Sequence, residues 1–117
     1  MSDMDMVLIT TSCGSRAEAE RIALALVEGR LAACVQVVPA TSIYRWREMV
    51  EQTSEHVLHI KTRAAMADRV GQLVAALHSY DVPELLILPV SGGSGEYLAW
   101  LATATATAKE EGPPPMG

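Results

Sequence analysis

The chain has 117 residues, of which 50% are hydrophobic and 20% charged, and this balance predicts one globular domain with its own core. The formal net charge is −5 and the few Lys and Arg residues form no cluster, which argues against sequence-independent binding to nucleic acids. No apolar run reaches about 18 residues and the acidic N-terminus lacks the features of a secretory signal, so we expect a cytoplasmic protein without a membrane span, in which Cys13 and Cys34 are free thiols.

The first elements in chain order are a strand and a helix. The continuous apolar run at residues 6–11 is typical of a strand buried on both faces. Ser15 and Glu18 match a capping box, in which each side chain satisfies a first-turn amide. Apolar residues at helical spacing then continue to Val27, and Gly29 is expected to end the helix in the left-handed conformation.

Two long strands follow, at residues 31–46 and about 49–62, and they are rich in Val, Ile, Thr, Tyr and Trp. We place the turn that joins them within residues 47–52. Pro39 cannot donate a ladder hydrogen bond, so it predicts a bulge or an edge strand. Each arm is much longer than a typical strand of about five or six residues, so the hairpin outruns the rest of a small domain.

The second half of the chain predicts a helix, a strand and a last helix. Apolar spacing indicates a helix over residues 64–79, which Pro83 prevents from continuing. The continuous apolar run at residues 85–90 is typical of a second buried strand. A Gly- and Ser-rich loop leads to the last helix, which is expected to begin near Ser94 or Glu96.

The resulting order is β-α-β-β-α-β with a C-terminal helix. This order predicts an α+β, ferredoxin-like fold, with both crossover helices on one face of a four-stranded antiparallel sheet. We expect residues 1–108 to form this single domain and residues 109–117, which include three consecutive prolines, to be a disordered tail.

Six short motifs, spread over residues 7–101, closely resemble the CutA divalent-cation tolerance family. They are Ala33-Cys34 followed by Pro39, Thr41-Ser-Ile-Tyr-Arg-Trp46, Ile60-Lys-Thr-Arg63, His78-x-Tyr80-x-x-Pro83-Glu84, Leu88-Pro89 and Tyr97-Leu-x-Trp100. The resemblance implies the ferredoxin-like fold and a tight homotrimer like those of PII-type signalling proteins. It also implies that the long hairpin pairs with a neighbouring subunit, and that the protein takes part in tolerance of copper and other divalent cations.

The sequence departs from the family pattern at two places. The family usually reads His-Pro-Tyr-Glu where this chain has His78-Ser-Tyr-Asp81. Some members carry a cysteine at the end of the first strand that is a proposed copper ligand. This chain has Thr11 at that place, with Cys13 two residues later on an expected loop near a helix N-terminus, where a thiolate is favoured.

Candidate metal ligands gather where the second helix runs into the last strand. His78, Asp81 and Glu84 lie within seven residues, and imidazole with carboxylates suits Cu(II), Zn(II) or Ni(II). Cys13 is the candidate soft ligand. One chain offers a single good nitrogen donor here, so a tight site needs groups from another subunit. The alternative is that this segment only shapes a turn and a subunit contact.

Candidate interface residues lie beyond Pro39. Exposed aromatic and Arg residues are common interface anchors, and Tyr44, Arg45 and Trp46 near the hairpin tip fit that description, with Tyr80 as a fourth member.

The functional prediction follows from these motifs. No Ser lies in a G-x-S-x-G elbow or pairs with a base, so we do not expect an enzyme. The leading hypothesis is a cytoplasmic homotrimer of metal-ion tolerance that binds copper or another divalent cation weakly. The alternative is a PII-like sensor that binds a small anionic ligand between subunits, near Arg63, Arg45 or Lys61, and signals to an unidentified protein partner. A third possibility is a stable scaffold with no ligand.

Overall fold

The computed structural model describes residue 2 and residues 5–106. The elements in chain order are strand β1 (Met6–Cys13), helix α1 (Arg16–Glu28), strands β2 (Cys34–Trp46) and β3 (Met49–Arg63), the short helix η1 (Ala64–Met66), helix α2 (Ala67–Leu77), strand β4 (Leu86–Pro89) and helix α3 (Gly95–Ala104). This order confirms the predicted ferredoxin-like arrangement. The predicted domain end at residue 108 and the predicted tail at 109–117 lie outside the described residues.

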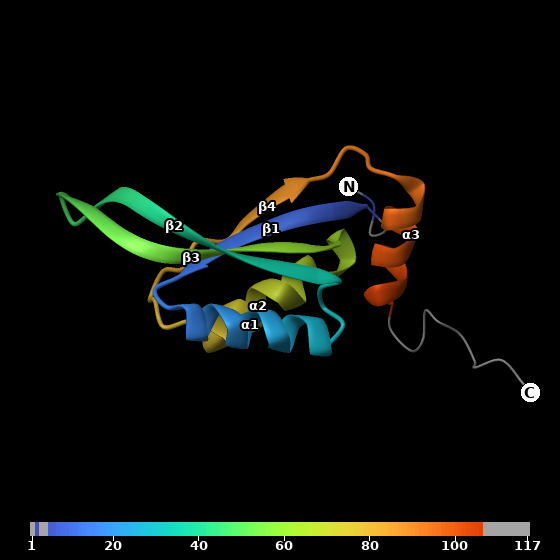
Figure 1. Cartoon of the computed structure of the whole chain (residues 1–117), viewed down its shortest axis with the longest axis horizontal. Helices are drawn as coiled ribbons and strands as arrows, with labels where there is room; N and C mark the ends of the chain where they lie inside the picture. The colour runs from blue at the N-terminus through green and yellow to red at the C-terminus, as the bar shows by residue number, and fades with distance from the viewer. Residues whose placement is uncertain (1, 3–4, 107–117) are drawn as a thin grey trace, which may run out of the picture.

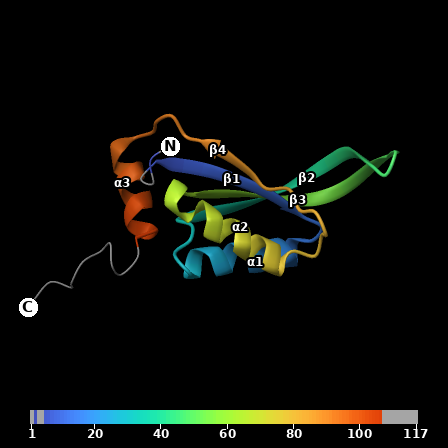
Figure 2. The same cartoon turned by 180° about the vertical axis from the view of Figure 1, so that it is seen from behind.

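The four strands form one antiparallel sheet in the order β2-β3-β1-β4. Helices α1 and α2 both lie against one face of this sheet, as Figures 1 and 2 show from opposite sides. We call the other face the open face, because α1 and α2 leave it uncovered. Helix α3 lies at the end of the sheet where β3 finishes.

The hydrophobic core fills the layer between the sheet and the two helices. Its largest members are fully or almost fully buried and come from β1, α1, β3 and α2: Val7, Ile9, Ile22, Leu26, Leu58, Ile60, Val70 and Val74. Since side chains alternate across a strand, the residues between them on β1 and β3 lie on the open face. The core is therefore completed inside one chain on the helix side only.

The ends of α1 agree only in part with the sequence prediction. The Ser15 hydroxyl accepts the N–H of Glu18 at 3.2 Å, as expected of an N-cap. The left-handed residue after the helix is Arg30, with φ of 59°, whereas Gly29 has φ of −81°. The Arg30 and Leu31 amides donate back to the carbonyls of Val27 and Leu26, which is a Schellman ending one residue later than predicted.

The β2–β3 hairpin is the longest feature of the chain. Its pairing runs unbroken from Cys34 opposite Lys61 to Trp46 opposite Met49, and the two turn residues 47 and 48 have φ of 49° and 70°. This is the geometry of a tight two-residue hairpin turn. Pro39 lies on an edge strand in regular register, so the bulge alternative is wrong and the edge alternative is confirmed.

The hairpin extends beyond its own sheet. Strand β1 pairs with β3 only as far as His56, so the part of the hairpin between residues 40 and 55 has no third strand beside it. Figure 1 shows this part projecting from the body of the molecule, whose principal extents are 61, 27 and 21 Å. The elongated shape is thus set by one hairpin.

The prediction of a second strand buried on both faces is wrong for the single chain. Strand β4 is a short edge strand, and the side chain of Leu86 is 57% exposed. An edge strand has one neighbour, and no helix within the described residues covers the open side of β4. The predicted helix at 64–79 begins as η1 and ends at Leu77, because His78 already has extended backbone angles.

A buried arginine anchors the end of α3. The Arg63 guanidinium, which is 2% exposed, donates from Nε to Thr105 Oγ1 at 2.9 Å and from Nη2 to the Thr105 carbonyl oxygen at 2.7 Å. Ser94 caps the other end of the helix, as predicted, by accepting the N–H of Tyr97. None of the helices in the described part of the chain is long and apolar enough to cross a bilayer.

Candidate functional site

His78 is held by two hydrogen bonds at the end of α2. Its side chain is fully buried, and ring atom Nε2 lies 2.7 Å from the carbonyl oxygen of Ser12, to which it donates. Ring atom Nδ1 accepts the backbone N–H of Tyr80 at 3.0 Å. These partners assign the proton to Nε2 and occupy both nitrogens, so neither is left to ligate a metal while the segment keeps this conformation.

Cys13 lies beside this histidine. Its Sγ is 3.7 Å from Nε2 of His78, and the side chain is fully buried as the last residue of β1. Burial, followed by the nearby charges of Glu18 and Glu55, raises the pKa of the Cys13 thiol to about 11. The expectation of a loop cysteine with a favoured thiolate is therefore wrong, because β1 continues two residues past the apolar run and carries Cys13 into the core.

Glu18 connects the two helices at this place. Its carboxylate accepts the backbone N–H of Ser79 at 2.5 Å and the Ser79 hydroxyl at 3.0 Å. Arg21, one turn further along α1, donates to the carbonyl oxygen of Leu77 at 3.3 Å. The segment after α2 is therefore fixed from α1, and its direction across the end of the sheet is set by these contacts.

Tyr80, in the same segment, contacts the open face of the sheet. Its phenol donates to Oε2 of Glu55 on β3 at 2.9 Å. Partial burial, then the hydrogen bond to the carboxylate and its negative charge, raise the pKa of Tyr80 to about 12. The phenol oxygen is also only 3.1 Å from the place that a Cβ on Gly14 would take, so a side chain at residue 14 would push it away from Glu55.

A cavity of about 850 Å³ lies on the open face between the hairpin and the segment after α2. We call it the open-face cavity. Its lining is formed by Thr10, Ser12, Ser42, Ile43, Tyr44, Trp46, Glu55, Val57, Tyr80, Asp81, Val82, Glu84, Leu86 and Leu88. The lining thus combines apolar and aromatic side chains with three carboxylates, and it includes no Lys, Arg or His.

The four predicted metal ligands do not converge within one chain. The structure brings Cys13 and His78 together, but the thiol is protonated below its raised pKa and both ring nitrogens are engaged. Asp81 and Glu84 instead line the open-face cavity. Among the described residues, no group of three or more His, Cys, Asp or Glu side chains is placed to hold a metal ion. The predicted site therefore depends on donors from outside this chain.

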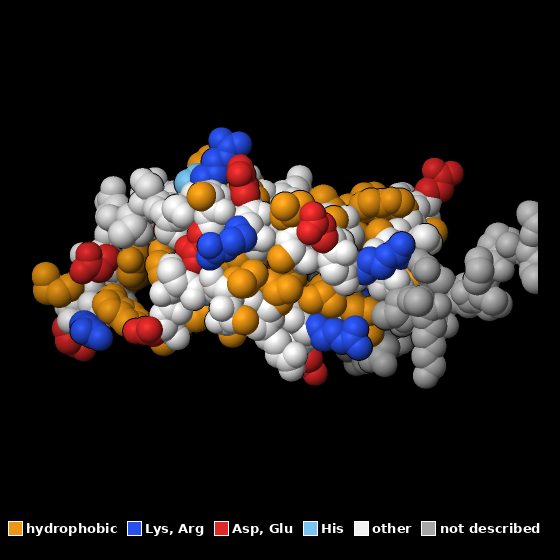
Figure 3. Space-filling view, turned by 90° about the horizontal axis from the view of Figure 1, so that it is seen from below, with side chains coloured by type: hydrophobic (Ala, Val, Ile, Leu, Met, Phe, Trp, Pro, Cys, Tyr) orange, Lys and Arg blue, Asp and Glu red, His pale blue; other side chains and the backbone are white. Residues whose placement is uncertain are grey.

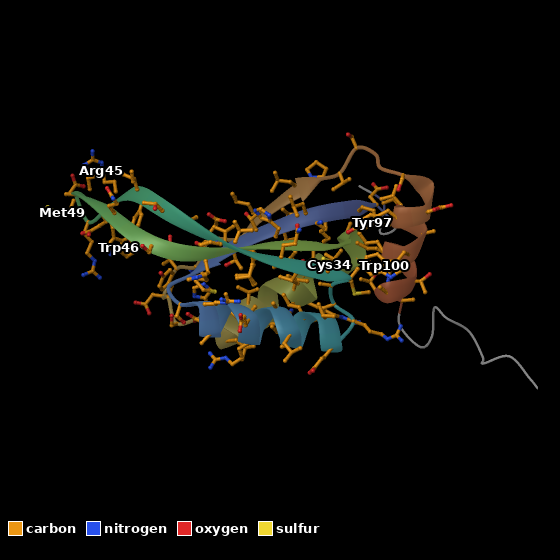
Figure 4. The ribbon with its side chains drawn as sticks, viewed as in Figure 1. Cys34, Arg45, Trp46, Met49, Tyr97 and Trp100 are labelled. Atoms are coloured by element: carbon orange, nitrogen blue, oxygen red, sulfur yellow. The ribbon has the colours of Figure 1, made fainter. Side chains whose placement is uncertain are left out.

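The predicted interface residues are exposed on the hairpin and beside it. Tyr44, Trp46 and Tyr80 are each about half exposed and line the open-face cavity. Figure 4 shows Arg45, Trp46 and Met49 at the hairpin tip, far from Cys34, Tyr97 and Trp100 at the other end of the sheet. Arg45 donates to the carbonyl oxygen of Glu48, within its own turn.

Sequence reasoning missed Glu18 and Glu55, which hold the segment after α2 at its two sides. Glu18 was predicted to cap its own helix, and nothing near Glu55 in the sequence indicates its contact with Tyr80. Both partners lie at least 25 residues away in the sequence, so only the fold brings them together.

Charges of both signs are interspersed on the surface seen from the helix side, which gives it no single-sign field (Figure 3).

The sequence is similar to a known protein family over most of its length. The family model described as CutA1 divalent ion tolerance protein matches residues 7–104. The Divalent-cation tolerance protein CutA of Thermus thermophilus is 47% identical over 102 residues, which are 86% of this chain and 97% of that protein. The chloroplastic Protein CutA of Arabidopsis thaliana is 39% identical over 100 residues, 85% of this chain, and the chain spans only 55% of its length.

The fold is shared with solved structures. The crystal structure of CutA from Xylella fastidiosa superposes with a TM-score of 0.85 at 42% sequence identity, and the match covers 87% of this chain and 99% of that one. Superposition at this TM-score over nearly the whole of both chains shows that the two proteins share one fold.

Proposed function

Because the chain belongs to the CutA1 divalent ion tolerance family, we propose that it serves divalent-cation tolerance as a homotrimer that binds copper or another divalent cation weakly. The observation that carries this proposal is the unpaired part of the hairpin together with the exposed edge strand β4. Both carry large exposed apolar side chains, and in one chain the hairpin segment has no third strand beside it and β4 has a strand on one side only.

The hairpin has the composition of an interface rather than of a solvated loop. Ile43 is 67% exposed and Met49 is 63% exposed, and Trp46 and Val50 lie beside them with large exposed areas. An exposed apolar patch of this kind is typical of a surface that another protein covers. In the proposed trimer, the hairpin of each subunit covers the open face and the β4 edge of its neighbour.

The β4 edge supplies the complementary surface. Leu86, Ile87 and Leu88 are all about half exposed although they form a continuous apolar strand. An uncovered edge with such side chains favours uncontrolled pairing between chains, and closed assemblies remove this risk. A ring of three chains that closes through the hairpins leaves no such edge.

Cation binding in this proposal rests on Asp81 and Glu84 with donors from a neighbouring subunit. Carboxylates bind divalent cations, and the small number of donors from one chain is consistent with weak affinity. His78 supports the segment that carries these carboxylates. It therefore acts on the site through Tyr80 and not as a ligand.

The open-face cavity argues against the alternative of a sensor for a small anion. Its lining holds three carboxylates and no basic residue. Of the basic candidates, Arg63 is buried against Thr105 and the Lys61 ammonium lies 5.9 Å from the ring centre of Tyr97. An anion in the cavity would meet negative charge without compensation, so we do not adopt the sensor hypothesis.

Calorimetric titration with Cu(II) tests the cation part of the proposal. The double variant Asp81→Asn with Glu84→Gln is expected to lose most of the binding heat of the wild type. The matched control Glu20→Gln with Glu28→Gln changes charge equally on the exposed side of α1 and is expected to bind as the wild type does. Equal binding by wild type and both double variants would contradict the assignment.

A further inference from the structure

Glu55 is a buried carboxylate that finds no compensating charge within the described part of its own chain. It is 7% exposed, and its Oε2 accepts a hydrogen bond from the neutral phenol of Tyr80. None of the described Lys, Arg or His residues forms an ion pair with it. Burying an ionised carboxylate is costly unless a positive charge or several hydrogen bonds compensate it. Because Glu55 lines the open-face cavity, which a neighbouring subunit covers in the proposed trimer, that subunit is placed to supply the charge.

The hairpin tip carries the basic residues that can reach a neighbour. Arg45 and Arg47 lie there, at the end of β2 and in the turn. The other basic residues of the described chain lie on the helices under the sheet or at the α3 end of the sheet: Arg16, Arg21, Arg69, Arg30, Lys61 and Arg63. The tip is also the part of the chain that extends furthest from its own sheet (Figure 4).

The two arginines of the tip differ in direction. Trp46 lines the open-face cavity, and the Arg47 guanidinium lies 5.9 Å from the centre of the Trp46 ring, without an acidic partner among the described residues. Side chains alternate along a strand, so Arg45 leaves β2 on the face opposite to Trp46. Arg45 also donates to the carbonyl oxygen of Glu48 within the turn. Arg47 is therefore the unpaired cation on the aromatic side of the tip.

The hairpin is long enough to carry its tip across a neighbouring sheet. Residues 40–46 have no third strand beside them, and seven extended residues span roughly 20 Å at about 3.3 Å per residue. A four-stranded sheet is roughly 15–20 Å wide, because its strands lie about 4.8 Å apart. In a ring of subunits that meet head to tail, each tip can thus reach the open face of the next subunit.

We propose that, in the homotrimer, the Arg47 guanidinium of each subunit enters the open-face cavity of the next subunit and pairs with Glu55. The guanidinium donates to Oε1 of Glu55, while Oε2 keeps the hydrogen bond from Tyr80. Asp81 and Glu84 are exposed, so an ion pair stabilises them less, and they stay available to a divalent cation. The pair requires the homotrimer proposed above, and it fixes how neighbouring subunits meet.

A double-mutant cycle on trimer dissociation tests the pair. Sedimentation over a dilution series, at one fixed urea concentration, gives the dissociation constant of each variant. Arg47→Gln is expected to raise this constant roughly tenfold or more, because it leaves Glu55 buried without a counter-charge. Glu55→Gln removes the charge but keeps an acceptor for the Tyr80 hydroxyl. In the Glu55→Gln background, Arg47→Gln is expected to change the constant by no more than about twofold.

Arg45→Gln is the matched control. It removes the same charge at the same hairpin tip, but from the face of β2 opposite to Trp46. We expect it to change the dissociation constant by less than about twofold, and to the same extent with and without Glu55→Gln. Circular dichroism of each variant confirms that the subunits are folded.

Two results with a trimeric wild type would overturn the ion pair alone. One is an Arg47→Gln trimer that dissociates as the Arg45→Gln trimer does, and this comparison involves only exposed positions. The other is an equal effect of Arg47→Gln in the wild-type and Glu55→Gln backgrounds. A wild type that sediments as a single chain would instead overturn the homotrimer, and the pair with it.

Discussion

The two faces of the sheet differ in how completely the chain buries their apolar side chains. On the helix side, Ile9, Leu58 and Ile60 are completely buried by α1 and α2 of the same chain. On the other side, Leu86 and Leu88 of β4 remain about half exposed, beside the carboxylates of the open-face cavity. Folding of a single chain therefore buries the apolar side chains of one face only. The other face keeps apolar side chains exposed, and this exposed surface extends along the hairpin beyond residue 40.

The largest expected effect comes from one substitution made on each face. Leu58→Ala should lower the free energy of unfolding by about 2–5 kcal/mol, because it opens a cavity in a fully buried core. Leu86→Ala removes the same atoms from a half-exposed site, so its effect on the isolated chain should stay below about 1 kcal/mol. Chemical denaturation at low protein concentration measures both. Equal losses would remove the distinction between the faces.

The next effect concerns the histidine that connects the two faces. His78→Ala removes the acceptor of the Tyr80 N–H and the donor to the Ser12 carbonyl, and we expect a loss of about 1–3 kcal/mol. The control is His59→Ala, on the half-exposed open face of β3. Thermal unfolding of both variants provides the comparison, and a His78 variant as stable as the His59 variant would show that the two hydrogen bonds do not hold the segment.

A smaller effect is expected from the contact between Tyr80 and Glu55. Tyr80→Phe deletes one partly buried hydrogen bond, and we expect a loss of about 0.5–1.5 kcal/mol. Tyr97→Phe removes a hydroxyl that forms no hydrogen bond with any other described residue, so it should be nearly neutral. The urea unfolding midpoints of the two variants provide the comparison. Identical midpoints would show that the Tyr80 hydroxyl does not stabilise the fold.

The smallest effect concerns pH. The pKa of the Cys13 thiol is raised from an ordinary value near 9 to about 11, so the folded state binds this proton more tightly than the unfolded state. The stability that this thiol contributes is therefore complete below pH about 9 and is lost as pH rises toward about 11. Melting temperatures across that window should fall less steeply for Cys13→Ala than for wild type and for the control Cys34→Ala. Parallel curves for all three proteins would contradict the raised pKa.

Local patterns in the sequence were sufficient for the elements of the helix side. The apolar run at residues 6–11 identified β1, and Ser15 and Ser94 identified two helix starts. These signals depend on neighbours within a few residues. The sequence predicted Gly29 as the left-handed residue after α1, whereas the structure has Arg30 in that conformation. The exact end of the helix depends on where the chain turns toward β2.

The open face could not be predicted to the same depth. A continuous apolar run such as residues 85–90 indicates burial, but it does not say whether the same chain or another copy provides the cover. Cys13 and Glu55 are buried through contacts with His78 and Tyr80, which are far away in the sequence. Such contacts follow from strand register and loop direction, which composition and periodicity do not determine.

The most direct test of the proposed difference between the faces is the mass of the wild-type particle in solution. Light scattering at micromolar concentration should give three times the chain mass of 12.5 kDa, and Met49→Asp at the exposed hairpin tip should lower that mass while circular dichroism stays unchanged. A wild-type particle with the mass of a single chain would contradict the claim that neighbouring copies cover the open face.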